Sequence, residues 1–163
     1  MTLTILVVDD DFATRLAIKD YLELSGYLIL EAENGEEALK KVEEYQPQLI
    51  VTDILMPIMD GYEFIRRVRC RPLFRLIPVV FLTTRNTMEE RIRGYQTGCD
   101  NYLPKPFELR ELGVIIRSLL EKSIIISQSN PPLKSQESGF SGEEELTEVT
   151  VVTPHPITQE LII

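Results

Sequence analysis

The sequence predicts an α/β fold built on a central parallel sheet of five strands. Three observations support this prediction. Five short apolar segments alternate with five longer segments of helical periodicity. Most of the apolar segments do not alternate in polarity, which is typical of strands covered on both faces. Charged residues follow several of them, at the strand ends where open α/β sheets place their sites.

The predicted strands are residues 4–8, 27–32, 48–53, 77–83 and 100–103. Strands that alternate with helices form parallel sheets with right-handed crossovers. The expected topology is therefore the flavodoxin-like, doubly wound (βα)5 arrangement with strand order 2-1-3-4-5. This order places the carboxyl ends of the first and third strands side by side.

Each predicted helix has an apolar stripe and a recognisable end. The stripe of the first comprises Thr14, Ala17, Ile18, Tyr21 and Leu22. The second, third and fourth helices follow Asn34, Asp60 and Thr87, each with a glutamate three residues later, which is the spacing of a capping box. The stripe of the fifth helix comprises Leu109, Leu112, Ile116, Leu119 and Leu120.

The composition changes after residue 123. We expect one domain over residues 1–123 and an acidic linker or tail over residues 124–163 that ends in an apolar segment. Serine, glutamine, proline, glycine and glutamate dominate residues 127–150, as in flexible linkers. The net charge of −9 lacks the basic excess of nucleic-acid-binding proteins, so we expect no direct nucleic-acid binding by this chain.

Cysteine usage and hydropathy exclude further classes. Cys70 and Cys99 form no CxxC pair, so we expect no zinc site or disulfide scaffold, and instead two reduced, buried thiols in a cytoplasmic protein. The apolar stretch 112–126 contains charged residues too early for a membrane span. The N-terminus lacks the positive region of a signal peptide.

Charged residues gather at strand ends. Asp9, Asp10 and Asp11 follow the first strand, Asp53 ends the third, and Lys105 ends a late apolar run. Two like charges ~4 Å apart repel by ~4 kcal/mol at a moderate effective dielectric, so clustered carboxylates attract a cation. Acids and a base at the ends of parallel strands predict a metal-assisted phosphoryl site.

Four segments in order resemble the receiver domain of two-component response regulators, over about residues 3–122. They are ILVVDD at 5–10, DILMP at 53–57 with DG at 60–61, PVVFLTT at 78–84, and YLPKPF at 102–107. The resemblance implies a phosphorylation-activated signalling switch and not an enzyme. Such a switch accepts a phosphoryl group from a sensor histidine kinase, supports its own phosphoryl transfer and dephosphorylates slowly.

The resemblance also assigns roles to residues. It implies that Asp53 is the phosphoryl acceptor and that Lys105 neutralises the transferred phosphoryl oxygens. It further implies Mg²⁺ (or Mn²⁺) held by Asp10, Asp53 and the backbone carbonyl of Leu55, with Asp9 orienting a bound water. Magnesium takes few carboxylates and keeps several waters, which suits this set.

Thr83 and Tyr102 are implied as the switch: Thr83 would bond a phosphoryl oxygen, and Tyr102 would turn inward. The resemblance also implies a cis peptide bond between Lys105 and Pro106. Asp11 lies one position too late for the metal site, so we expect it to cap the first helix.

Three residues depart from the family pattern. Leu55 and Arg85 occupy the positions that flank the path of a hydrolytic water, and Leu55 cannot orient water. We therefore expect a phosphoryl group that persists longer than with polar residues there. Thr84 is bulkier than the usual small residue and could narrow access to the site.

Other functions fit less well. An aspartyl-phosphate hydrolase would need a second acid at position 55, and a nucleotide- or flavin-binding protein would need a Gly-rich loop after the first strand. Residues 93–100 resemble receivers of cyanobacterial and plastid regulators with a NarL-type output, which implies transcriptional regulation by a DNA-binding domain missing from this chain. The alternative is a stand-alone receiver that acts through a partner protein. The fourth helix, fifth strand and fifth helix form the expected exchange face, including for a homodimer.

Overall fold

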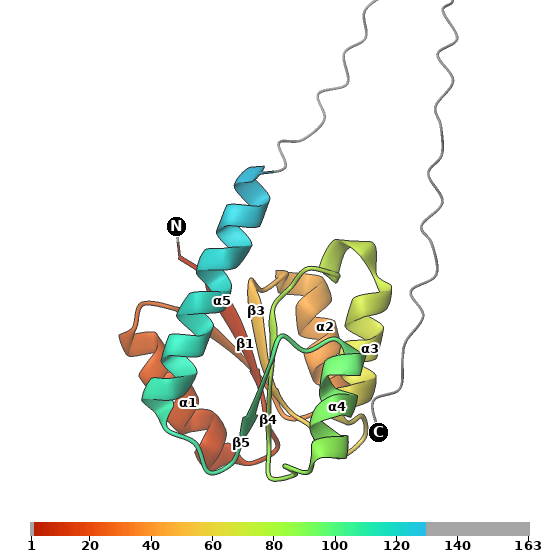
Figure 1. The fold of residues 1–163 in the computed structure, drawn as a ribbon. Helices are drawn as coiled ribbons and strands as arrows, with labels where there is room; N and C mark the ends of the chain where they lie inside the picture. The colour runs from red at the N-terminus through yellow and green to blue at the C-terminus, as the bar shows by residue number, and fades with distance from the viewer. Residues whose placement is uncertain (1, 130–163) are drawn as a thin grey trace, which may run out of the picture. The chain divides into compact units, whose positions relative to one another are not determined.

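The computed structural model describes residues 2–129, and the sheet within them has five parallel strands. These are β1 (Thr4–Val8), β2 (Leu28–Ala32), β3 (Leu49–Asp53), β4 (Val79–Thr83) and β5 (Asn101–Pro104). Their order is β2-β1-β3-β4-β5, which confirms the predicted doubly wound topology. Figure 1 shows the strands side by side at the centre of the domain.

The helices are α1 (Phe12–Leu24), α2 (Gly35–Tyr45), α3 (Gly61–Cys70), α4 (Met88–Thr97) and α5 (Leu109–Ser129), with a short 3₁₀ helix, η1, at Pro72–Phe74. The first four have the same kind of start. A side chain caps each of these helices by accepting a hydrogen bond from the backbone N–H three residues later. The capping residues are Asp11, Asn34, Asp60 and Thr87. These bonds satisfy donors that the first turn of a helix leaves free, so each helix begins where the sequence predicts.

Two apolar cores lie on opposite faces of the sheet. Side chains of α2 and α3 pack with one set of strand residues, and those of α1 and α5 pack with the other. Figure 1 shows α1 and α5 on one side of the strands and α2, α3 and α4 on the other. All residues of β3 and β4 are buried, because helices cover both of their faces.

Two predictions about burial are wrong in part. Ala17 is exposed, and Arg15 occupies the buried stripe of α1 together with Ile18 and Leu22. Arg15 can lie on the buried stripe because its guanidinium has hydrogen-bond partners there, described below. Cys99 is buried as expected, but Cys70 is exposed at the last turn of α3, and both thiols are free.

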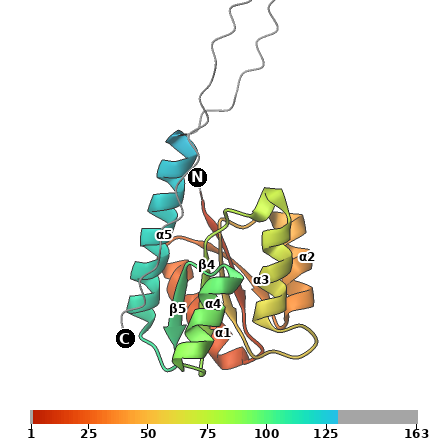
Figure 2. The ribbon, with the colours of Figure 1, turned by 45° about the vertical axis from the view of Figure 1, so that its right-hand side comes forward.

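Helix α5 includes residues on both sides of the expected domain boundary. It continues past the expected boundary at residue 123 to Ser129, because neither glycine nor proline interrupts this stretch. Figure 2 shows its last turns extending beyond the other elements. The rest of the predicted tail, residues 130–163, lies outside the described residues. Within residues 2–129, every helix is too short or too polar to cross a bilayer.

Candidate functional site

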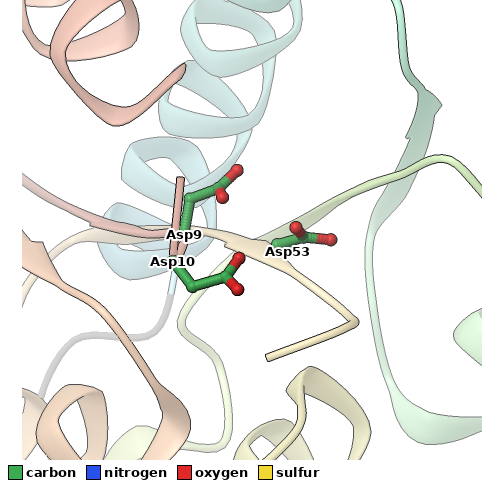
Figure 3. A group of neighbouring side chains, drawn as sticks. All are labelled: Asp9, Asp10 and Asp53. Atoms are coloured by element: carbon green, nitrogen blue, oxygen red, sulfur yellow. The ribbon is translucent and has the colours of Figure 1, made fainter. Parts of the chain in front are cut away.

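Strand pairing brings the acidic residues together. β1 and β3 are neighbours with Val8 opposite Thr52, so Asp9 and Asp53 leave adjacent strand ends. Asp10 follows directly. One carboxylate oxygen of each of Asp9, Asp10 and Asp53 lies within 4.8 Å of the others. In Figure 3, the three carboxylates extend to the same side of the two strand ends.

The three carboxylates differ in solvent exposure, and a lysine lies beside them. Asp9 is 1% exposed and Asp53 is 8% exposed, whereas Asp10 lies open to solvent at the mouth. The Nζ of Lys105 lies 2.7 Å from Oδ2 of Asp9 and 3.1 Å from Oδ2 of Asp53. This ammonium follows β5, and the peptide bond between Lys105 and Pro106 is cis, as the resemblance implied.

Burial and neighbouring charges shift the ionisation of this cluster. Burial raises the pKa of the Asp53 carboxyl, the ammonium of Lys105 opposes the rise, and the charge of Asp9 adds to it. Burial alone would lower the pKa of Lys105, but the hydrogen bond to Asp9 and the two carboxylate charges together raise it. The acids thus hold a cation firmly, while Asp53 is costly to ionise without one.

The loop after β3 approaches Asp53 closely. The N–H of Ile54 donates to Oδ1 of Asp53 at 2.7 Å, and the N–H of Gly61 donates to the carbonyl of Ile54 at 2.8 Å. A Cβ on Gly61 would lie 2.3 Å from the carbonyl oxygen of Asp53, so only glycine fits there. The side chain of Leu55 is 44% exposed beside this loop.

The predicted switch residues lie next to this cluster. Thr83 ends β4 and is fully buried, and its hydroxyl accepts the N–H of Arg85 at 3.1 Å. Its carbonyl accepts the N–H of Lys105 at 2.8 Å, which connects β4 to the base. The Tyr102 ring points inward, and its hydroxyl donates to the carbonyl of Arg85.

The contacts of two further side chains, Arg15 and Glu90, were not predicted from the sequence. Arg15 donates from Nη1 to the backbone carbonyl of Asp9 at 2.8 Å. Its spacing from Ile18 and Leu22 is helical, and this was the signal that could have placed it on the buried stripe. The carboxylate of Glu90 accepts the hydroxyl of Tyr62 at 2.7 Å and pairs with the guanidinium of Arg85 at 3.3 Å.

The donor set fits a hard divalent cation. It offers three carboxylates from two adjacent strand ends, and one of them, Asp10, faces solvent, which leaves room for metal-bound waters. A bound cation would offset the burial and the Asp9 charge, which raise the pKa of Asp53, and would attract a phosphoryl donor.

A family model for the response regulator receiver domain matches residues 5–117. The chain belongs to this family. The match spans all five strands and ends within α5, so the fold and the family agree.

Curated relatives extend the comparison. The chain is 42% identical over 121 residues to the response regulator Rre1 of Synechocystis sp., covering 74% of this chain and 52% of that protein. It is 38% identical over 138 residues to the probable transcriptional regulator ycf29 of Porphyra purpurea, covering 85% and 65%. The chain thus spans only half to two thirds of the length of these relatives.

A solved structure has the same fold and a related sequence. The receiver domain of the sensor histidine kinase PA1611 from Pseudomonas aeruginosa superposes with a TM-score of 0.69 at 28% identity, covering 74% of this chain and 99% of that one. That structure is described with a magnesium ion coordinated in the active-site cleft.

Proposed function

We propose that this receiver domain is a phosphorylation-activated switch in which Asp53 accepts a phosphoryl group from a sensor histidine kinase. The observation that best supports the proposal is the convergence of three carboxylates and the Lys105 ammonium at the ends of β1, β3 and β5. Asp53 is the member that ends β3, the central strand of the sheet, and its Oδ2 lies 3.1 Å from the Nζ of Lys105.

The chemical step is an in-line displacement. A carboxylate oxygen of Asp53 attacks the phosphorus of a phosphohistidine, the P–O bond of an acyl phosphate forms, and the P–N bond breaks. The leaving imidazole takes its proton from solvent. Lys105 binds the transferred oxygens as a point charge, and its 3.1 Å distance to Asp53 supports this role.

Asp10, Asp53 and the backbone carbonyl of Leu55 would hold Mg²⁺ or Mn²⁺, with Asp9 acting through a water. The ion supplies charge neutralisation for the incoming phosphoryl donor. The related receiver domain with magnesium in its cleft supports this choice of ion. The exposure of Asp10 supports a site that keeps several waters.

The output step begins at Thr83. In the proposal the Thr83 hydroxyl keeps accepting the N–H of Arg85 and donates its own proton to a phosphoryl oxygen, so the loop between β4 and α4 moves with it toward the site. Tyr102 follows because its hydroxyl is bonded to the carbonyl of Arg85. The readout surface is then α4, β5 and α5, where Ile92, Tyr95 and Val114 are exposed.

Transcriptional regulation is the output we favour, executed by a DNA-binding domain beyond the receiver domain. The relative named as a probable transcriptional regulator, and the greater length of both relatives, support it. The second candidate is a receiver that acts through a separate partner protein. A homodimer through the α4–β5–α5 surface is a further possibility in either case. It is tested by measuring the molecular mass of the native protein in solution with and without beryllium fluoride, a mimic of the phosphoryl group.

The central test is phosphorylation by a small phosphodonor. The chain is incubated with acetyl phosphate and Mg²⁺, and intact mass is recorded. We expect a gain of one phosphoryl group that is removed by hydroxylamine, which cleaves acyl phosphates but not serine or threonine phosphates. The gain should require Mg²⁺ and disappear in Asp53→Asn.

Asp20→Asn is the matched control, because Asp20 is an exposed acid on α1 to which the proposal assigns no role. It should be phosphorylated like the native chain. Phosphorylation of Asp53→Asn at the native rate, or a modification resistant to hydroxylamine, would contradict the assignment of Asp53.

A further inference from the structure

Arg15 lies beneath the acidic cluster and is 6% exposed. A buried guanidinium must find partners for its donors, since an unpaired buried charge is very costly. All of its nitrogens have partners: Nη1 donates to the carbonyl of Asp9 at 2.8 Å, Nε to Glu31 at 3.2 Å and Nη2 to Glu33 at 3.4 Å. The ring of Phe12 lies 5.5 Å from the guanidinium carbon and covers it.

The contact with Asp9 is the informative one. The carbonyl that Arg15 binds belongs to the peptide bond joining Asp9 to Asp10, so it lies between two of the three clustered carboxylates. The N–H of Asp9 is held separately by the carbonyl of Ala32 at 3.1 Å. Both peptide groups of Asp9 are therefore fixed, one by β2 and the other by Arg15.

The other two contacts anchor the guanidinium to the end of β2. Glu31 is the last but one residue of β2, and it also binds Lys19 at 3.1 Å. Burial opposes the charge of Glu31, but hydrogen bonds from Lys19 and Arg15 hold the pKa of its carboxyl below the usual range. The Glu31 carboxylate therefore stays charged and keeps the guanidinium in one orientation.

The carboxylate of Asp9 is held directly, by the N–H of Asp11 at 2.9 Å and by Lys105 at 2.7 Å. We propose that Arg15 is a positioning residue for the divalent cation: by holding the Asp9 carbonyl, it fixes the peptide that leads to Asp10 and sets the direction in which Asp10 presents its carboxylate. This inference rests on the proposed metal site. Mg²⁺ demands near-ideal octahedral geometry, whereas Ca²⁺ tolerates irregular ligand positions. Arg15 therefore favours Mg²⁺ over Ca²⁺.

The charge of Arg15 and its positioning role predict opposite effects of its removal on Mg²⁺ affinity, so the measurement distinguishes them. A positive charge near a cation site weakens cation binding, so removing Arg15 by charge alone would tighten Mg²⁺ binding. Loss of ligand geometry weakens it. Outer groups that orient metal ligands typically change metal affinity by about 10- to 100-fold.

The experiment measures Mg²⁺ and Ca²⁺ dissociation constants by titration calorimetry on the whole chain, at a temperature where circular dichroism shows every variant folded. Arg15→Lys keeps the charge but loses the guanidinium fork, and Arg15→Met keeps the apolar stem and loses both. Lys19→Met is the matched control, since Lys19 shares Glu31 and, among the described residues, makes no hydrogen bond to Asp9.

We expect both Arg15 variants to weaken Mg²⁺ binding by about tenfold and Ca²⁺ binding by no more than about twofold. Lys19→Met should leave both within about twofold of the native chain. If Arg15→Met fails to fold, Arg15→Lys decides the question. A purely structural role would lower both apparent affinities by the same factor, and tighter or unchanged Mg²⁺ binding would overturn the inference.

Failure of the proposed function has a different signature. In that case the native chain itself binds Mg²⁺ no better than Asp10→Asn does, before any Arg15 variant is compared. A native chain that binds Mg²⁺, together with Arg15 variants of unchanged Mg²⁺ to Ca²⁺ ratio, would leave the metal site standing and remove only the role of Arg15.

Discussion

The ring of Tyr102 lies directly against the backbone of Gly94. A Cβ built on Gly94 would lie 2.8 Å from Cδ2 of Tyr102, closer than side chains approach one another in folded proteins. Gly94 is in the middle of α4, where glycine is a poor choice for helix stability. The absence of a side chain at this position is thus what allows Tyr102 to lie inward over α4.

Gly94→Ala should destabilise the domain by about 1–3 kcal/mol, because the added methyl overpacks the Tyr102 ring. In an unconstrained helix the same substitution would stabilise by about 1 kcal/mol. Urea unfolding monitored by circular dichroism measures the difference.

The control is the same substitution in a Tyr102→Ala background. There the methyl group has space, so Gly94→Ala should become neutral or stabilising by up to about 1 kcal/mol. Equal effects in both backgrounds would show that the Tyr102 ring does not restrict position 94.

The adjacent residues Asp10 and Asp11 should have different roles, Asp10 in binding the cation and Asp11 in stabilising α1. Asp11 accepts the backbone N–H of Thr14 at 3.2 Å as the cap of α1, whereas Asp10 belongs to the acidic cluster. Asp11→Ala should lose about 1 kcal/mol of unfolding free energy and keep the stabilisation by Mg²⁺. Asp10→Ala should lose that stabilisation, which for the native chain is about 2.7 kcal/mol at a concentration 100-fold above Kd.

Thermal unfolding with EDTA and with MgCl₂ reads out both effects. The two variants serve as controls for each other, because each removes one carboxylate from the same loop. A normal Mg²⁺ shift in Asp10→Ala, or a lost shift in Asp11→Ala, would contradict the division of roles.

Local sequence signals predicted the framework because they act over a few residues. Capping side chains at Asp11, Asn34, Asp60 and Thr87 fix helix starts, and continuous apolar runs fix the buried strands. The strand order 2-1-3-4-5 is one of the common orders of doubly wound parallel sheets. The composition changes near residue 123, but α5 continues through that point, since residues 123–129 contain neither glycine nor proline.

The sequence predicted the charged residues that stand at strand ends, but not the contacts between side chains of distant elements. Thr87 and Glu90 have the spacing of a capping box, and Thr87 does cap α4, yet the Glu90 carboxylate binds Tyr62 and Arg85 instead. Tyr62 lies 28 residues away in sequence, so no local pattern reports this bond. Arg15 was missed for a related reason: its acidic partners follow on another element, near the end of β2.

Cys99 should make stability fall at alkaline pH. Burial, aided by the charge of Asp100, raises the pKa of the Cys99 thiol to about 12 from an ordinary value of 9.0. The unfolded chain therefore loses this proton first, so the contribution of Cys99 to stability is constant below about pH 9 and is lost as the pH rises toward about 12. Cys99→Ala should fall less steeply between about pH 8 and about pH 10.5 in urea unfolding.

Cys70→Ser is the control for this comparison, because the Cys70 thiol is exposed. Its pH dependence should match that of the native chain. In the native chain a thiol reagent should modify Cys70 readily and Cys99 only after unfolding. Rapid labelling of both cysteines under native conditions would refute the buried state of Cys99.

Leu55 should prolong the lifetime of the proposed acyl phosphate. Its side chain stands two residues beyond Asp53 and is 44% exposed, where a polar group could orient an attacking water. At the second flanking position, Arg85 is paired with Glu90 at 3.3 Å, which directs its guanidinium toward α4. Leu55→Asn supplies a donor and an acceptor, so autodephosphorylation should accelerate by about tenfold. Loss of the phosphorylated mass over time, after removal of the phosphodonor, measures the rate.

Leu55→Met separates polarity from shape, since methionine is apolar and similar in volume. It should leave the rate within about twofold of the native value. Neither substitution should change Mg²⁺ affinity, because the proposed ligand at position 55 is the backbone carbonyl and not the side chain. An Asn variant that dephosphorylates as slowly as the Met variant would mean that water reaches the phosphorus by a path that residue 55 does not control.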